Sequence, residues 1–202
     1  MKYFLLLFAV LVCSINIGCG NKAQKYTDAP YSGPVLEKYC SNPERLLVIE
    51  TKFGTMKLQL FDKVAPNHVA QITKLAKEGK YDGCTFHRVI PDFMIQGGDP
   101  NSKDDNLSDD GSGSMGDMLK AEFNEVSHKR GVASMARTND PNSASSQFFI
   151  CHGNPTFLDH QYTVWGQLVV GYDVMDKIAK LPKNGSDNPG KDATMTKVYI
   201  EE

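Results

Sequence analysis

The sequence has few of the features that mark nucleic-acid-binding, metal-binding or redox proteins. Its 202 residues carry 22 Lys and Arg against 24 Asp and Glu, which leaves a net charge of −2. Nucleic-acid binding asks for clustered basic residues, and none are found here, so no nucleic-acid partner is expected. The content of 41% hydrophobic residues is that of an ordinary globular protein.

Cysteine and histidine are also scarce, and their spacing excludes the common metal sites. The chain has five cysteines with no C-x-x-C, and five histidines with no H-E-x-x-H or similar pair. No G-x-S-x-G surrounds a serine, so a serine nucleophile is not expected. We therefore expect no metal and no cofactor. If Cys13 and Cys19 belong to a leader, three cysteines remain, and an odd number cannot all pair; Cys84 and Cys151 are expected to be buried free thiols.

The first 19 residues differ from the rest of the chain. After Lys2, the stretch 3–17 carries no charge. It is too short to cross a bilayer, which takes about 20 apolar residues, and it suits the apolar core of a signal peptide. The run ends in Gly18-Cys19-Gly20, which resembles a bacterial lipoprotein processing site, although Asn16 stands where that motif usually has an aliphatic residue.

Residues 1–19 are therefore expected to be a signal, with Cys19 as the lipidated first residue of an exported protein. A lipid on Cys19 would anchor the protein to a membrane in the periplasm or cell envelope. Secretion after cleavage nearby and an uncleaved anchor are the alternatives. Residues 20–43 are polar and broken by Pro30, Gly33 and Pro34, so they are expected to form a flexible tether with at most a short ordered piece at 35–40. Residues 44–202 are expected to form the folded domain.

Within that domain, short strand patterns outnumber helical ones. Alternating or continuous apolar residues predict strands at 46–49, 56–60, 131–135, 147–151, 163–169 and 195–200. Apolar residues at a spacing of three to four predict helices at 66–79 and 173–181. The acidic stretch 100–118 lacks the spacing of a calcium loop and is expected to be a surface loop. Two helices among seven or eight strands predict a mainly β fold, a closed antiparallel barrel with helices at its ends.

One stretch, 84–99, suggests a binding groove. It places Arg88, the pair Phe93-Met94 and the amide of Gln96 within nine positions. An arginine beside two large apolar residues does not suit a core, whereas it suits a groove that binds an apolar group and hydrogen-bonds it at one point.

Four motifs in this order resemble the cyclophilin family of peptidyl-prolyl cis-trans isomerases. They are F-H-R-V-I-P-D-F-M-I-Q-G-G-D at 86–99, S-M-A-R at 134–137, S-S-Q-F-F-I at 145–150 and F-L-D at 157–159. The resemblance covers about residues 46–200. It implies an eight-stranded antiparallel barrel capped by two helices, a monomer that needs no cofactor, and activity on proline-containing segments of unfolded or folding proteins.

Carried over position by position, the resemblance makes Arg88 the catalytic residue. The substrate groove that it implies consists of Phe93, Met94, Gln96, Ala136, Arg137, Gln147, Phe149, Phe157, Leu158 and Tyr162. Phe157, Tyr162 and Arg137 stand where the best-known eukaryotic members have Trp, His and Asn. The tryptophan matters for cyclosporin binding in that family, so Phe157 puts high drug affinity in doubt but not the isomerase activity.

Two functions from different classes follow from these residues. The first is an isomerase that assists the folding of exported proteins. The second is a proline-binding or chaperone-like module whose catalysis is incidental. His87 invites an acid/base role, but isomerisation needs no proton transfer, and we expect a structural histidine beside the groove.

Overall fold

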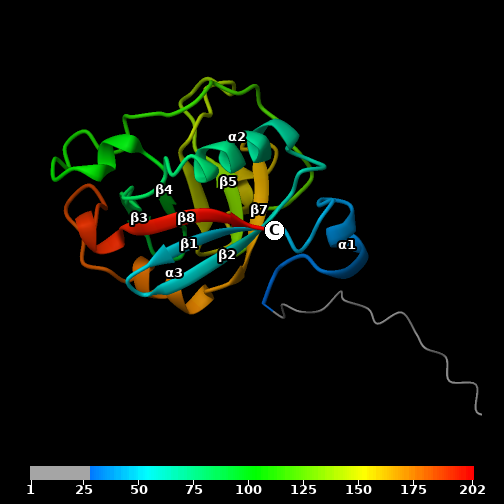
Figure 1. Ribbon diagram of the computed structural model, residues 1–202, viewed down its shortest axis with the longest axis horizontal. Coiled ribbons are helices and arrows are strands. Elements are labelled where there is room, and N and C mark those ends of the chain that lie inside the picture. The colour runs from blue at the N-terminus through cyan, green and yellow to red at the C-terminus, as the bar shows by residue number, and fades with distance from the viewer. Residues whose placement is uncertain (1–27) are drawn as a thin grey trace, which may run out of the picture.

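A computed structural model describes residues 28–202, which fold into one curled, eight-stranded antiparallel sheet with helices packed against it (Figure 1). Neighbouring strands follow the order β3-β4-β6-β5-β7-β2-β1-β8. The strands are β1 (Leu46–Thr51), β2 (Gly54–Leu60), β3 (Arg88–Ile90), β4 (Met94–Gly97), β5 (Val132–Met135), β6 (Phe148–Cys151), β7 (Val164–Val170) and β8 (Met195–Glu201).

The two edges of the sheet meet through a short bridge. The N–H of Phe86 donates to the Ala193 carbonyl at 2.9 Å, and the N–H of Met195 donates to the Cys84 carbonyl at 2.8 Å. Thr85 and Thr194 form an isolated antiparallel pair between these bonds. The predicted eight strands and antiparallel pairing are confirmed, while the closure rests on this bridge before β3 and not on a full ladder between β3 and β8.

Two main helices pack on the sheet, as predicted. Helix α2 (Pro66–Lys77) has proline in its first turn and buries Val69, Ile72 and Leu75. Helix α3 (Tyr172–Ala179) follows Gly171, whose positive φ turns the chain into the helix. In Figure 1, α2 lies above β8 and α3 lies below β2. The shorter helices are α1 (Gly33–Glu37), η1 (Pro100–Lys103), η2 (Thr156–Leu158) and η3 (Gly190–Ala193).

Apolar residues form two separate clusters because successive side chains of a strand point to opposite faces. In β6, Phe148 and Ile150 belong to the interior core of the barrel, whereas Phe149 and Cys151 belong to a second cluster on the outer face. We call this second group the outer cluster. Its buried members are Tyr39, Cys40, Phe61, Met94, Val126, Val132, Phe149, Cys151, Leu158 and Val164.

The segment before β1 differs from the predicted tether. Residues 31–40, here called the N-terminal strap, lie against the barrel, with Tyr39 and Cys40 buried in the outer cluster. Tyr31, Tyr39 and Phe61 form a group of ring contacts at centroid distances of 5.4–6.3 Å. Five of the ten residues of the strap are apolar, but Gly33 and Pro34 interrupt them, and the local pattern does not show which part of the barrel they pack against. The predicted signal 1–19 and Cys19 lie outside the described residues.

Two further findings concern the described part of the chain. No helix in residues 28–202 is long and apolar enough to cross a membrane. Cys40, Cys84 and Cys151 are buried free thiols, as predicted for the last two. Burial raises the pKa of Cys84 to about 11, so this thiol stays protonated and unreactive near neutral pH.

We predict that Gly98→Ala destabilises the barrel where the groove strand β4 ends. Gly98 has φ of 87°, and an added Cβ would lie 2.5 Å from the Ser146 carbonyl oxygen. The combined strain and clash should lower the free energy of unfolding by about 2–4 kcal/mol, measured by urea denaturation. Gly185→Ala is the matched control, because its Cβ would meet nothing within 4 Å. Equal stability of the two variants would contradict the prediction.

Candidate active site

A row of residues across three strands forms the centre of the site. Arg88 of β3 lies opposite Gln96 of β4, and Gln96 lies opposite Phe149 of β6. Residues directly opposite each other in an antiparallel sheet project from the same face. Met94, two residues before Gln96, shares that face. The row therefore sets a guanidinium, an amide and an aromatic ring side by side on the outer face of the sheet.

An apolar surface extends from this row. Met94, Phe149 and Leu158 are buried in the outer cluster, and Phe93, Ala136 and Tyr162 pack against it with part of their surface exposed. We call these six residues the groove floor. The Phe149 and Tyr162 rings meet edge to face at 5.9 Å. Phe157 stacks on Phe93 at 5.8 Å and is 67% exposed, which places it at the rim.

A polar edge borders the floor. Nε2 of Gln96 donates to Oε1 of Gln147 at 3.0 Å. Nε2 of Gln147 donates in turn to the carbonyl oxygens of Gly111 and Gly113, at 2.9 and 2.8 Å. Gln147 is thus fixed at both ends of its amide, and it fixes the orientation of Gln96. Sequence reasoning missed the two glycine carbonyls, because a backbone acceptor leaves no signal in residue type.

The two arginines of the site differ in their availability. The Arg88 side chain is exposed and makes no hydrogen bond or ion pair with any residue in 28–202, so its guanidinium donors are free for a ligand. Arg137 donates from Nε and Nη2 to the Gln161 carbonyl, at 3.1 and 2.9 Å, and from Nη1 to the Thr138 carbonyl at 2.8 Å. Its guanidinium also lies 4.5 Å from the Tyr162 ring centroid. The Arg137 side chain therefore holds the segment 161–162 in place.

His87 is buried behind Arg88. Only 4% of its surface is exposed, and neither ring nitrogen has a hydrogen-bond partner among the described residues. It lines a hollow of about 370 Å³ beside the row, together with Arg88, Gln96, Asp110 and Asn188. Burial lowers the pKa of His87 and so favours the neutral ring. The charges of Asp99 and Asp110 act in the opposite direction, but their effect is smaller.

A histidine behind Phe149 was not anticipated. The ring of His128 stacks on Phe149 at 6.0 Å with an interplanar angle of 18°. Its Nδ1 lies 2.8 Å from Oδ1 of Asp159, the last residue of the F-L-D motif. His128 stands in a polar stretch with no periodicity, so nothing in the sequence marks it, whereas its partner Asp159 is adjacent to a predicted groove residue.

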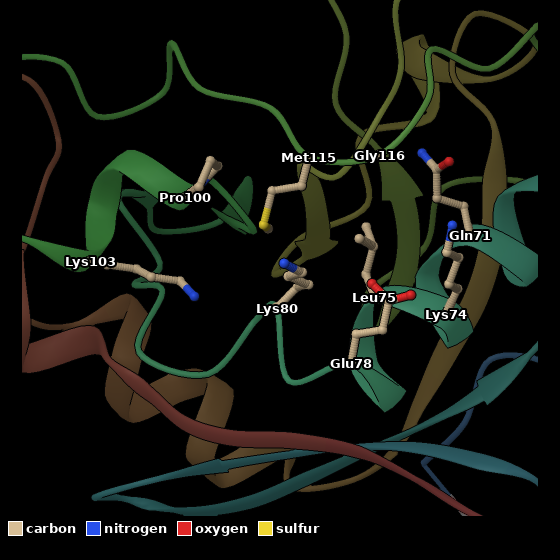
Figure 2. Close-up of a pocket in the computed structure, with 9 residues that line it drawn as sticks. All are labelled: Gln71, Lys74, Leu75, Glu78, Lys80, Pro100, Lys103, Met115 and Gly116. Carbon is tan, nitrogen blue, oxygen red and sulfur yellow. The ribbon is translucent and has the colours of Figure 1, made fainter.

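A second hollow lies apart from the groove. Figure 2 shows this space of about 470 Å³ between α2 and the stretch that carries Pro100 and Met115. Lys74, Lys80 and Lys103 stand at its edges, and it shares no lining residue with the site described above. Within residues 28–202, no group of three or more His, Cys, Asp or Glu is placed to hold a metal ion.

Comparisons with known proteins agree with this geometry. The family model of the cyclophilin type peptidyl-prolyl cis-trans isomerases matches residues 46–200. A probable peptidyl-prolyl cis-trans isomerase of Brucella suis is 43% identical over 167 residues, which cover 79% of this chain and 85% of the relative. A peptidyl-prolyl cis-trans isomerase of Synechococcus elongatus is 46% identical over 120 residues, which cover 59% of this chain and 77% of that protein.

A solved structure has the same fold. The cyclophilin type isomerase of Cryptosporidium parvum, crystallised in the presence of the dipeptide Ala-Pro, superposes with a TM-score of 0.71 at 28% identity, covering 78% of this chain and 99% of that one. The fold, the motifs and the family match define a class of proline isomerases. The chain belongs to the cyclophilin-type peptidyl-prolyl cis-trans isomerases (EC 5.2.1.8).

We predict that His87 contributes to acid sensitivity. Its pKa is lowered from the ordinary 6.5 by burial, so the folded state binds fewer protons than the unfolded chain in the range between the two values. The stabilisation is therefore complete above the unfolded pKa and is lost as the pH falls through the folded pKa.

His87→Gln should make thermal stability less dependent on pH below about 6.5, by no more than the slope of one proton, about 1.4 kcal/mol per pH unit. Calorimetry over this pH range measures the difference. The wild type, measured over the same pH range, is the reference for this slope. An unchanged slope in His87→Gln would mean that the ring is not held neutral.

Proposed function

We propose that Arg88 is the catalytic residue of this isomerase and that the groove floor holds the proline ring of the substrate. The observation that carries the proposal is the free guanidinium of Arg88 in one cross-strand row with Gln96 and Phe149. A buried or paired arginine could not offer its donors to a peptide. Arg88 is exposed at the end of the row, next to an apolar surface of suitable chemistry.

The reaction explains why these residue types suffice. Rotation about a peptide bond has a barrier of about 18–20 kcal/mol, because nitrogen shares its lone pair with the carbonyl. In the twisted transition state that lone pair is localised on nitrogen. A guanidinium can donate a hydrogen bond to it, or to the proline carbonyl, and it never gives up its proton. The step therefore needs no nucleophile and no general base.

The floor and the polar edge supply the selective binding. Catalysis requires tighter binding of the twisted amide than of either planar form. Met94, Phe149 and Leu158 present the apolar surface on which a pyrrolidine ring can rest away from water. Since Nε2 of Gln96 donates to Gln147, the side-chain carbonyl oxygen of Gln96 remains to accept a hydrogen bond from the substrate backbone. The Ala-Pro dipeptide used with the Cryptosporidium relative supports proline peptides as the substrate class.

We predict that Arg88→Ala lowers kcat/KM on an Ala-Pro-type peptide by about 100-fold or more, as expected when a single preorganised donor to the transition state is removed. Arg88→Lys should recover only part of the loss, because a point charge cannot reproduce the planar fork. A protease-coupled assay measures both. Arg45→Ala, which alters an arginine before β1 that contacts Thr73 and Glu202, should keep the wild-type rate.

The same variants separate the two functions. If Arg88→Ala loses the isomerase activity and also the function in cells while still binding client protein, catalysis is the function. If the cellular function survives without catalysis, the protein acts as a proline-binding or chaperone-like module. Wild-type kcat/KM in Arg88→Ala would refute the assignment of this residue.

The same proposal extends to the place of action, which is outside the cytoplasm on a lipid anchor at Cys19. The uncharged run 3–17 followed by Gly18-Cys19 supports it. Between Cys19 and the strap there are 11 residues, 20–30, which span at most about 40 Å when fully extended. An anchor at Cys19 would therefore keep the groove close to the membrane, where newly exported chains emerge and fold.

We predict that the mature protein recovered from membranes begins at Cys19 and carries the mass of two or three acyl chains. A single serine substitution, Cys19→Ser, should release the protein from the membrane fraction, since no lipid can then be attached. Cys13→Ser is the matched control and should remain membrane-bound. Intact-mass spectrometry is the measurement, and an unlipidated mature chain that starts elsewhere would refute the anchor.

A further inference from the structure

The N-terminal strap and the groove floor are parts of the same apolar cluster. The buried members of the outer cluster include Tyr39 and Cys40 from the strap together with Met94, Phe149 and Leu158 from the floor, and Tyr31 and Leu36 pack against it. The family match covers residues 46–200, so the strap lies outside the matched segment. The floor of the groove therefore rests partly on residues outside that segment.

Tyr31 fixes the strap at three atoms. Its hydroxyl donates to the Ser127 carbonyl at 2.9 Å, and its N–H donates to Oε1 of Gln167 at 3.0 Å. Nε2 of Gln167 donates back to the Tyr31 carbonyl at 2.8 Å. Burial raises the pKa of the Tyr31 phenol to about 12, so the hydroxyl stays a donor at any physiological pH.

From Ser127 the contacts continue to the groove. The Ser127 hydroxyl donates to Oδ2 of Asp159 at 2.6 Å, and the N–H of His128 donates to Oδ1 of Asp159 at 2.7 Å. Although partial burial alone would raise it, these bonds hold the pKa of Asp159 below its ordinary value. Asp159 is thus an ionised acceptor that ties the 127–128 loop to Leu158, its neighbour in the chain.

His128 completes the support beneath Phe149. Its Nδ1 faces Asp159, its Nε2 lies 3.1 Å from the Ser134 hydroxyl, and it is completely buried. Burial lowers the pKa of His128 in spite of Asp159, which favours a neutral ring. Only the face of the ring meets Phe149. Because both nitrogens are engaged away from the groove, this histidine has no route to a substrate proton.

We propose that Tyr31, Asp159 and His128 form a support that positions Phe149 and Leu158 for isomerisation, so that the working catalytic unit begins at the strap and not at residue 46. These three are positioning residues, since none of them is part of the groove surface. A floor that must discriminate a twisted amide from a planar one has to be held to within about 0.5 Å, which requires such a second layer. The inference rests on the proposed function of the groove.

The test uses two variants of the full-length protein that each break one link. Tyr31→Phe removes only the hydroxyl that donates to Ser127, and Asp159→Asn keeps the side-chain shape but removes the charge that accepts from Ser127 and His128. We expect kcat/KM to fall about three- to tenfold in Tyr31→Phe and more in Asp159→Asn, since small displacements at a reacting centre have large effects on rate. Folded protein is quantified by circular dichroism at the assay temperature.

A spectroscopic measurement separates positioning from a general loss of stability. The methyl resonance of Met94, on the floor, should shift in Tyr31→Phe. Two controls should leave it unchanged: Val35→Ala, which alters a 43% exposed residue of the strap, and Tyr199→Phe, which removes the phenol hydroxyl of a residue in β8.

The outcomes are distinct. A reduced rate with a shifted Met94 signal in fully folded Tyr31→Phe supports the inference. A wild-type rate and signal in Tyr31→Phe overturns it, even if Asp159→Asn fails to fold. Arg88→Ala is assayed in parallel, because wild-type activity in that variant would refute the proposed function of the groove and not the support beneath it.

Discussion

The alternation of side chains on a curled sheet is the constraint on which the rest of this structure depends. The inward side chains of β4, β5 and β6 fill the barrel, so the outward side chains of the same strands need a second cover. Over the buried Met94 and Phe149 that cover is incomplete at the partly exposed Phe93, Ala136 and Tyr162, which form the surface of the proposed groove. A strand residue cannot move from one face to the other without a register slip, so barrel packing and groove geometry are fixed together.

Availability, more than residue type, separates the two arginines of the site. The Arg137 guanidinium donates hydrogen bonds to the carbonyls of Gln161 and Thr138 and stacks on Tyr162. The Arg88 guanidinium has no hydrogen-bond or ion-pair partner in residues 28–202. A hydrogen bond that is already made in the free enzyme must be broken before a ligand can use its donor, which offsets most of the gain. The free guanidinium of Arg88 is therefore the one suited to the proposed reaction. The Arg137 guanidinium, which is already hydrogen-bonded, fixes the position of Tyr162 instead.

Local sequence patterns predict the strands and helices of the barrel, whereas contacts between residues far apart in the sequence do not follow from them. The period of two at 56–60 and the helical spacing at 66–79 depend on neighbours in sequence, and the motifs place Arg88, Gln96 and Phe149 by resemblance. For the strap the sequence predicts a tether with at most a short ordered piece at 35–40, since its packing depends on hydrogen bonds such as that from Tyr31 to Ser127, 96 positions away. The sequence does not indicate His128 for the same reason. Its contacts are with Phe149 and Asp159, and no motif or periodic pattern surrounds it in the sequence.

The hydrogen bonds that fix the strap to the barrel bear on the proposed anchor at Cys19. Tyr31 is tied through its backbone N–H and carbonyl to Gln167, in the middle of β7, and Gln167 also donates to Gln59 of β2. A force applied to the residues before Tyr31 is therefore transmitted first to β7 and β2, through the hydrogen bonds of Gln167. The hydrogen bond from the Tyr31 phenol to Ser127 lies beyond this junction. The proposed support beneath Phe149 is thereby separated from a force applied through the proposed anchor at Cys19, so anchoring would leave the groove floor in its shape.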